Sequence, residues 1–514
     1  MSKEQERAAL HRTIWKIAED LRNSVDGWDF KAYVLGMLFY RFISEDLARY
    51  LNKLVADTGK ADFDYASMSD EDAIHGKEQT VQEKGYFILP SELFQNVAKR
   101  AKNDDALNET IKRIFTNIEE SAKGTASEPD LKGLFSDFDV NSNKLGGTVT
   151  QRNAKLTEII ESIAGFNLGA DLHEANIDVF GDAYEFLMTM YASNAGKSGG
   201  EFFTPQEVSK LLALIAIDGR ETINKVYDPA CGSGSLLLQF KKLMGNKAKN
   251  FYGQEKNITT YNLCRINMFL HGVNFERFDI ACEDTLINPQ HWDDQPFDAI
   301  VSNPPYSTKW IGSDDVTLIN DLRFSPAGVL APKSKSDLAF TMHMLSWLAT
   351  TGVAAIVEFP GVLYRGGAEM KIRKFLVENN YVDAIIQLPD NLFFGVSIAT
   401  CIIVLRKSKA DNNVLFIDGS NEFVHEGNKN KLSDANIARL HEAVVSRRAS
   451  DHFSAIVPNT TIAGHDYNLS VSSYVEKEDT REAIDIDDLN AEIARIVARQ
   501  NVLRKEIDEL VKTL

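Results

Sequence analysis

The spacing of apolar residues predicts that the first part of the chain is mainly helical. Apolar residues recur every three or four positions between residues 10 and 21, and the stretch 33–51 is a second apolar-rich segment with the same period. Residues 124–147 are rich in Ser, Asp, Asn and Gly and predict a loop. The helical period then resumes at 156–163 and at 182–191. We therefore expect this part of the chain to fold as packed helices.

From about residue 225 the pattern changes to short apolar runs that alternate with helical segments. Runs of this kind are typical of buried strands, and strands that alternate with helices form parallel sheets covered on both faces. We therefore expect an α/β fold here, with a doubly wound and mostly parallel sheet. The predicted strands are 225–227, 250–252, 298–301, 353–358, 383–387 and 400–405.

The end of the chain has a different period again. Mostly apolar residues alternate four and three positions apart, as the seam of a coiled coil requires. The seam spans only about three heptads, so it fits a helix that packs on its own chain as well as one that packs against another chain. The seam positions are Leu489, Ile493, Ile496, Gln500, Leu503, Ile507 and Leu510.

Length and composition limit the class of protein. A chain of 514 residues predicts two or three domains, and 44% hydrophobic with 25% charged residues is ordinary for a globular protein. The four cysteines form no CxxC pair, so neither a disulfide framework nor a metal site is suggested. No apolar run is long enough to cross a bilayer, and the charged start is unlike a signal peptide. We expect a cytoplasmic protein without a membrane segment.

A glycine-rich segment follows the first predicted strand. The letters DPACGSG at 228–234 lie where that strand would end and a helix over 236–244 would begin. Glycines there let the backbone turn sharply and approach a ligand. The third glycine of the dinucleotide pattern G-x-G-x-x-G is absent, and Asp228 precedes the turn. An acid at this place suits a ligand with an amino group, such as S-adenosylmethionine, although a purely structural turn fits the same letters.

Two further acids follow the next strands. Glu255 comes just after the second strand, where a carboxylate can accept hydrogen bonds from both ribose hydroxyls. Asp284, with Glu283 beside it, follows a third candidate strand and is placed to accept from the adenine amino group of a cofactor. Either acid alone is typical of a solvated loop. The three acids in this order favour a nucleoside cofactor.

The tetrapeptide NPPY at 303–306 follows another predicted strand. Proline pairs often simply end strands, so a turn is one interpretation. The other concerns an amino group conjugated to an aromatic ring, which is a poor nucleophile. Two acceptors, the side-chain oxygen of Asn303 and the carbonyl of Pro304, can draw such a nitrogen towards tetrahedral geometry and stabilise the developing charge. Pro305 would help to fix the backbone, and Tyr306 would stack on a base flipped out of a duplex.

Several motifs occur in the order that is found in one class of S-adenosylmethionine enzymes. Upstream of the glycine loop and the NPPY tetrapeptide lies GGEFFTPQ at 199–206. The segments 361–367 and 388–395, and the stretch 21–42, are also similar to that class. On these motifs, which span most of residues 10–410, the sequence resembles the modification subunits of type I restriction–modification systems, a group of gamma-type N6-adenine DNA methyltransferases.

The resemblance implies a role for each motif. Asn303, Pro304, Pro305 and Tyr306 would hold the target amine, and Phe393 or Phe394 would add a second aromatic wall for the flipped base or serve only in packing. Glu255 would bind the ribose, and Asp284, or Glu283 beside it, would read the cofactor adenine. The other residues expected around S-adenosylmethionine are Glu201, Phe202, Phe203, Thr204, Pro205, Gln206, Asp228, Ala230, Cys231, Gly232, Ser233 and Gly234.

The partners follow from what the chain lacks. The short remainder after residue 405 shows no basic, aromatic-interleaved patch, and the net charge of −18 opposes binding to phosphates. The resemblance implies that a separate specificity subunit reads double-stranded DNA, with two modification subunits to each specificity subunit. It also implies a restriction subunit in the full complex. A DNA-binding surface on these partner subunits would compensate for the negative net charge of this chain.

We therefore predict three domains: a helical N-terminal domain (1–150), a methyltransferase catalytic domain (151–475) and a C-terminal docking helix (476–514). The predicted reaction transfers a methyl group from S-adenosylmethionine to N6 of adenine in DNA. The NPPY tetrapeptide alone does not exclude transfer of the methyl group to N4 of cytosine in DNA. The amide nitrogen of a glutamine side chain in a protein is a similarly poor nucleophile, so a protein methyltransferase is another alternative. The helical N-terminal region, the FFTP letters and the length argue against the glutamine enzyme. The complete tetrapeptide argues against a non-catalytic scaffold.

Overall fold

The computed structural model describes residues 29–165, 204–393, 397–427, 429–477 and 486–512. The helices predicted at 10–21 and 182–191, and the segment Glu201 to Phe203, lie outside these residues. The contacts divide the chain into two units, Met1–Val475 and Glu476–Leu514. Within the described ranges, no helix is long and apolar enough to cross a membrane.

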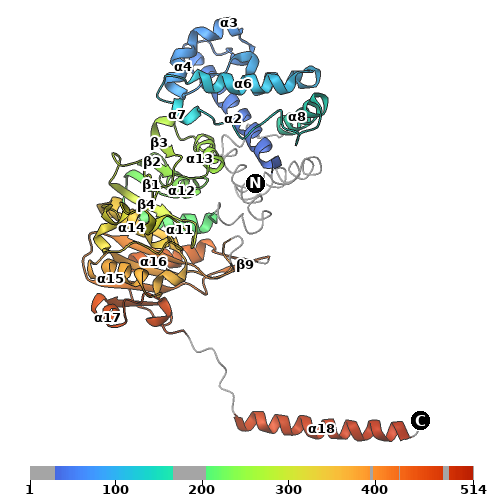
Figure 1. Cartoon of the computed structure of the whole chain (residues 1–514). Helices are drawn as coiled ribbons and strands as arrows, with labels where there is room; N and C mark the ends of the chain where they lie inside the picture. Colours follow the sequence, from blue (N-terminus) through green and yellow to red (C-terminus); the bar gives the residue numbers. More distant parts are fainter. Residues whose placement is uncertain (1–28, 166–203, 394–396, 428, 478–485, 513–514) are drawn as a thin grey trace. The chain divides into compact units, whose positions relative to one another are not determined.

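The first described part is helical, as predicted (Figure 1). In α6 the buried residues Leu107, Ile111, Ile114 and Ile118 recur at helical spacing and face α8. The predicted loop 124–147 contains one short helix, α7, which the loop-like composition did not reveal and in which Pro129 occupies the first turn. The helices are α2 (Asp29–Ala56), α3 (Asp70–Ala73), α4 (Lys77–Lys84), α5 (Phe94–Arg100), α6 (Leu107–Ser121), α7 (Glu128–Leu131) and α8 (Val149–Ala164).

A nine-stranded sheet forms the centre of the larger part of the first unit, with the order β11-β8-β6-β7-β5-β4-β1-β2-β3. The neighbouring strands β5, β4, β1, β2 and β3 pair parallel in this order. Strand β7 runs antiparallel to β5 and to β6, and β11 runs antiparallel to β8. The strands are β1 (Ile223–Asp228), β2 (Ala248–Gln254), β3 (Phe278–Ala281), β4 (Phe297–Ser302), β5 (Leu348–Glu358), β6 (Val382–Gln387), β7 (Cys401–Arg406), β8 (Asn413–Asp418) and β11 (Ser454–Pro458).

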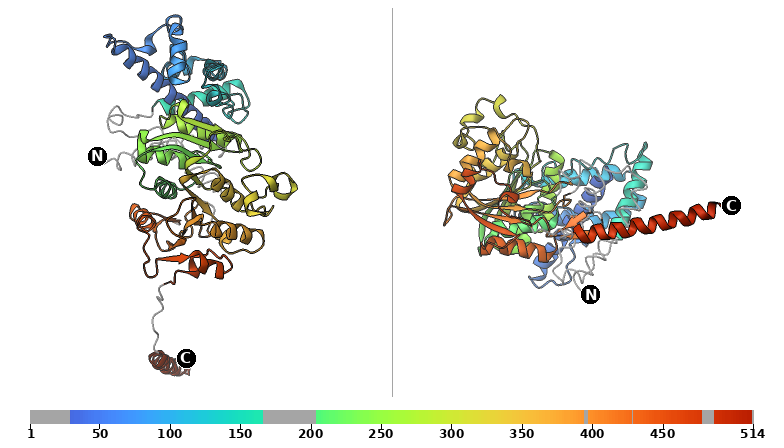
Figure 2. Two further views of the ribbon diagram at one scale, coloured as in Figure 1. Left: turned by 90° about the vertical axis from the view of Figure 1, so that its left-hand side faces the viewer. Right: turned by 90° about the horizontal axis from the view of Figure 1, so that it is seen from below.

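Helices cover both faces of this sheet (Figures 1 and 2). Side chains alternate along each strand, so Val226 of β1 joins the core under α11 and α12, and Tyr227 joins the core under α14. The fold class is therefore confirmed as a doubly wound α/β fold. The helices are α11 (Gln206–Ile217), α12 (Ser235–Met244), α13 (Ile258–Leu270), α14 (Asp337–Trp347), α15 (Ala368–Glu378), α16 (Asp434–Ser446) and α17 (Asn459–Gly464).

The N-terminal helices are joined to the sheet domain through α13. The buried Arg265 guanidinium donates to the carbonyls of Pro129 and Lys132 at 2.9 and 3.0 Å. The Asn262 carboxamide donates to Asp137 at 3.0 Å. These bonds link the helical region to the helix that runs between β2 and β3.

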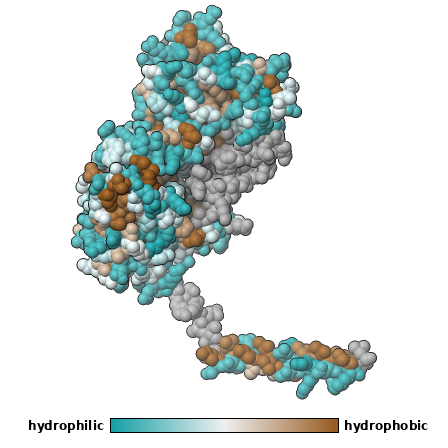
Figure 3. Space-filling view, viewed as in Figure 1, coloured by the Kyte–Doolittle hydropathy of each residue, from teal (hydrophilic) through white to brown (hydrophobic). Residues whose placement is uncertain are grey.

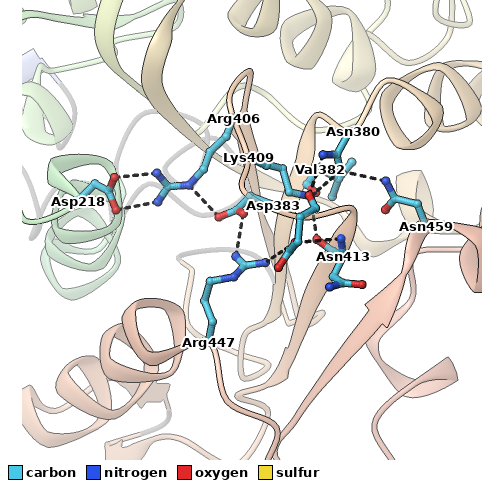
Figure 4. Close-up of polar contacts among 10 residues, drawn as sticks. Asp218, Asn380, Val382, Asp383, Arg406, Lys409, Asn413, Arg447 and Asn459 are labelled. Carbon is cyan, nitrogen blue, oxygen red and sulfur yellow. Dashed lines mark hydrogen bonds and ion pairs between the residues drawn. The ribbon is translucent and has the colours of Figure 1, made fainter.

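A network of charges fixes α11 at the end of the sheet opposite to the carboxyl ends of β1 and β4 (Figure 4). Arg406, the last residue of the reversed strand β7, donates two hydrogen bonds of 2.7 Å to Asp218, which caps the carboxyl end of α11. It also donates to the buried Asp383 at 2.9 Å, and Arg447 donates to the same carboxylate at 2.7 Å. The network therefore sets the position of a helix whose other end begins at Gln206.

The second unit contains α18 (Ile486–Lys512), which has no buried residue. The seam predicted from the heptad spacing is helical, and its apolar side chains are exposed, from 45% for Leu489 to 65% for Leu510. Figure 3 shows apolar side chains gathered along this helix.

Candidate active site

The first strand delivers Asp228 to the carboxyl edge of the sheet. One carboxylate oxygen, Oδ1, accepts from the backbone N–H of Ala230 at 3.0 Å and from the Ser302 hydroxyl at 2.9 Å. The other oxygen, Oδ2, is buried and has no hydrogen-bond partner. Burial raises the pKa of the Asp228 carboxyl to about 7, although both hydrogen bonds oppose the shift. A buried acceptor without a partner marks a place where a donor is missing.

The glycine loop passes from this strand to α12. Gly234 has a φ of 79°, and a Cβ added there would lie 2.8 Å from Sγ of Cys264, so neither the backbone nor the space admits a larger residue. The Asn267 side chain donates to the carbonyl of Ser233 at 3.0 Å. The loop is therefore held from α13 as well as from its own strand.

Glu255 closes the other side of the loop. Its two carboxylate oxygens accept from the backbone N–H groups of Gly232 at 3.1 Å and of Asn257 at 2.7 Å. Burial raises the pKa of the Glu255 carboxyl, and the backbone hydrogen bonds oppose this shift. The carboxylate thus lies against the glycine loop in a fixed orientation.

Of the two adjacent acids after β3, Asp284 is the more enclosed. Its Oδ2 pairs with Nζ of Lys256 at 2.9 Å, and its Oδ1 accepts from the backbone N–H of Leu286 at 3.1 Å. The Glu283 side chain is exposed. Of the two acids expected near the cofactor adenine, Asp284 is therefore the better candidate. Its lysine partner was not predicted from the sequence.

The carboxamide of Asn303 lies between two hydroxyl groups. Its Nδ2 donates to Oγ1 of Thr204 at 3.0 Å, and its Oδ1 accepts from the Tyr306 hydroxyl at 2.5 Å. The Tyr306 ring lies edge-on to Phe359 and Phe393, with centroids 5.1 and 6.3 Å away. Burial, and then Glu358, raise the pKa of the Tyr306 phenol well above its usual value, so the hydroxyl remains a donor at neutral pH.

The segment before α11 lies next to these residues. Thr204 and Pro205 are buried, and Thr204 contacts Asn303 as described. The Gln206 side chain donates to the Ser235 hydroxyl at 3.1 Å and accepts from Gln239 at 2.5 Å, so it is tied to the start of α12. The structure brings these residues to the glycine loop; Glu201, Phe202 and Phe203, and also Phe394, lie outside the described residues.

Three supporting residues were missed by the sequence analysis. Ser302 joins Asp228 to the strand that carries Asn303, and its position directly before the tetrapeptide was a usable signal. Asn267 and Lys256 are distant in sequence from their partners, and nothing in their spacing indicates those contacts.

The described residues contain one group of three metal-ligating side chains, Asp279, His291 and Asp294, whose ligand atoms lie within 4.8 Å of one another. The buried His291 ring faces the Gly253 carbonyl through Nε2 at 3.0 Å and the Asp294 carboxylate through Nδ1 at 3.3 Å. The expectation of no metal site stays a prediction.

Comparison with known proteins defines the class and then the family. Residues 175–483 match the family model described as N-6 DNA methylase, and residues 10–163 match the HsdM N-terminal domain. Together with the fold and the site, these matches define a methyltransferase. The chain belongs to the methylase subunits of type I restriction enzymes, as the matched relatives show. The family predicted from the motifs is thereby confirmed.

The relatives cover nearly the whole chain. The type I restriction enzyme MpnII methylase subunit of Mycoplasma pneumoniae is 47% identical over 99% of this chain and 97% of its own length. The MjaVII methylase subunit of Methanocaldococcus jannaschii is 29% identical over 97% of this chain and 83% of its own length. The crystal structure of a type I methyltransferase subunit from Streptococcus thermophilus has 35% identity and a TM-score of 0.82, covering 91% of this chain and all of that one.

Proposed function

We propose that this chain transfers a methyl group from S-adenosylmethionine to N6 of adenine in double-stranded DNA, at sites read by a separate specificity subunit. One observation carries the proposal. Ser302 bonds to the buried Asp228, and the next residue, Asn303, presents its carboxamide oxygen at the same edge of the sheet. A cofactor site and an amine-binding site therefore meet across the paired strands β1 and β4.

The residues present fit the cofactor. The unpartnered Oδ2 of Asp228 suits the cofactor ammonium group, Glu255 suits the ribose hydroxyls, and Asp284 suits the adenine amino group. The glycine loop, from Ala230 to Gly234, and the segment from Glu201 to Gln206 would enclose the rest. When bound, S-adenosylmethionine supplies a methyl group on a positively charged sulfur, which leaves as a neutral thioether.

The side chains beside that site act on the target amine. Asn303 Oδ1 and the Pro304 carbonyl accept hydrogen bonds from the amino hydrogens, localise the nitrogen lone pair and stabilise the positive charge that develops during attack. Thr204 fixes the orientation of the Asn303 amide, because its hydroxyl oxygen accepts from the Nδ2 group. Tyr306 supplies an aromatic surface for the base. The proton is lost from the methylated amine afterwards, so no strongly basic residue is required.

The C-terminal helix is the proposed docking element for the specificity subunit. Its exposed seam needs an apolar partner, and the heptad spacing suits another helix. In this proposal the division into 1–150, 151–475 and 476–514 separates helical, catalytic and docking functions. The complex would contain two of these chains for each specificity subunit, with a restriction subunit added in the full enzyme.

The docking proposal is tested by removing residues 485–514. The shortened chain should lose assembly with the specificity subunit in size-exclusion chromatography and should bind S-adenosylmethionine with unchanged affinity in calorimetry. Assembly by the shortened chain would refute the docking role without touching the proposed chemistry.

The chemistry is tested by transfer of a labelled methyl group to unmethylated DNA, with and without the specificity subunit, followed by mass analysis of the nucleosides. We expect N6-methyladenine only in the presence of the specificity subunit. An Asn303→Ala variant should bind the cofactor and transfer nothing. Detection of N4-methylcytosine, or of a methylated protein glutamine instead of methylated DNA, would refute adenine as the substrate.

A further inference from the structure

A small hairpin far along the chain contacts residues 390–393, which lie in the connection between β6 and β7. The hairpin consists of β9 (Val424–Glu426) and β10 (Lys429–Lys431), which pair antiparallel. The loop follows β6, the strand beside the reversed β7.

Asn430 makes the central contacts. Its side chain is 8% exposed, and its Nδ2 donates to both the carbonyl and the side-chain oxygen of Asp390, at 3.0 and 2.9 Å. Its backbone N–H donates to the Asn391 carbonyl at 3.2 Å. Beside it, Nζ of Lys429 donates to the Phe393 carbonyl at 3.1 Å. Two consecutive hairpin residues thus hold three residues of the loop.

The hairpin contacts this loop where its backbone takes a left-handed turn. Asn391 has a φ of 53°, in the left-handed region that asparagine adopts more readily than most other L-residues. The carbonyl that accepts from the Asn430 backbone belongs to this same residue. The hairpin therefore adds a hydrogen bond at the residue where the loop turns.

The other end of the contact chain lies in the proposed active site. The Phe393 ring is 2% exposed and meets the Tyr306 ring edge-on, at 6.3 Å between centroids and 85° between planes. Tyr306 in turn donates to the Asn303 carboxamide oxygen. Displacing the loop would move the aromatic neighbour that supports Tyr306.

We propose that Asn430 is a positioning residue for methyl transfer: through the loop 390–393 it holds Phe393 against Tyr306, so that the aromatic surface for the target base is formed before the base arrives. Asn430 acts through Phe393 and contacts neither the base nor the cofactor. The proposal rests on the proposed function, since it assumes that a flipped base meets Tyr306.

The test uses an Asn430→Asp variant in complex with the specificity subunit. The side chain at residue 430 keeps its shape but loses the amide that donates two hydrogen bonds. Its carboxylate then faces the Asp390 carboxylate and carbonyl, which are acceptors as well. Adding Asp390→Asn gives the loop an amide that donates back to residue 430, and this double variant should recover part of the activity. Asn421→Asp, the same chemical change at an exposed position before the hairpin, is the matched control.

Four quantities are measured: kcat, KM for DNA, the affinity for S-adenosylmethionine, and the fluorescence of 2-aminopurine at the target position, which rises when the base leaves the stack. We expect Asn430→Asp to lower kcat about 10- to 100-fold, because small displacements in an active site cost that much. The fluorescence rise should shrink, and cofactor affinity and assembly should not change. Lys429→Met should act in the same direction more weakly, which keeps the test valid if Asn430→Asp folds poorly.

Two results would overturn the proposal. One is an Asn430→Asp complex with the kcat and fluorescence of the Asn421→Asp complex. The other is a loss of cofactor binding and assembly in parallel with activity, which would mark a purely structural role. If the unaltered complex methylates no adenine, the proposed function fails, and this inference fails with it; normal methylation by the unaltered complex separates the two cases.

Discussion

Replacing Asp228 by asparagine should make the cofactor-free protein more stable and abolish cofactor binding. The fully buried carboxyl has a pKa of about 7, against 3.8 for an ordinary aspartate. Because the folded pKa is the higher one, ionisation opposes folding. The destabilisation is absent below pH 3.8, grows as the pH rises from 3.8 to about 7, and is complete above that. Asparagine carries no charge at any of these pH values.

The size of the effect follows from the two pKa values. A change from 3.8 to about 7 corresponds to roughly 4 kcal/mol at high pH. At pH 5.5 roughly half of that is already present, so the advantage of the variant should grow by about 2 kcal/mol between pH 5.5 and pH 8. The asparagine oxygen can keep the bonds from Ala230 and Ser302, and its amide is left without a partner. That second cost, about 1–3 kcal/mol, does not depend on pH.

Thermal unfolding of both proteins at pH 5.5 and pH 8, without cofactor, measures this prediction. The difference in Tm between Asp228→Asn and the unaltered protein should increase by about 3 °C towards pH 8. Saturating S-adenosylmethionine should raise the Tm of the unaltered protein and leave that of the variant unchanged. A Tm difference that does not vary with pH would show that Asp228 is ionised throughout, and would refute the reasoning.

Two further predictions concern the supports of the site. Thr204→Val should lower kcat about 10- to 100-fold and change cofactor affinity little, because the Asn303 amide loses the acceptor that orients it. Thr204→Ser should keep most of the rate in the labelled-methyl assay. A normal rate in Thr204→Val would contradict the role of Thr204 in orienting Asn303. Arg406→Met should lower the free energy of unfolding by about 3 kcal/mol, because the buried Asp383 then keeps only Arg447 as an ion-pair partner among the residues that the structure describes. Urea unfolding measures this free energy. A loss below about 1 kcal/mol would mean that the network contributes no more than ordinary surface ion pairs.

The sequence predicted the strands that carry the chemistry because these strands are buried and apolar. Five of the six predicted segments lie within strands, and 400–405 begins one residue before β7. The acids and the tetrapeptide stand at strand ends, where parallel sheets bind ligands. The reversal of β7 was not predicted, since an apolar run such as 400–405 carries no sign of its direction. The strands β8 and β11 were not predicted either; β11 is a short edge strand whose few residues show no clear alternation.

The contacts that orient the site could not be predicted. Thr204 and Asn303 are far apart in sequence, and so are Asn430 and Asp390; their bonds exist only because the sheet brings separate segments together. A motif gives the identity of a chemical group. It does not give the second group that fixes its orientation, because many residue types at many positions can supply one hydrogen bond.

In the proposed function, the same contacts connect cofactor binding to the geometry of methyl transfer. Thr204 orients Asn303, and two residues later Gln206 is tied to the start of α12, directly after the glycine loop. A shift of this segment therefore changes the proposed cofactor site and the catalytic amide together. At the far end of α11, the pair of Asp218 with Arg406 restrains the same helix against the sheet. We therefore predict that Arg406→Met lowers kcat in addition to stability, because the position of α11 is less restrained. Unchanged kcat in that variant would show that Thr204 is held by its local contacts alone.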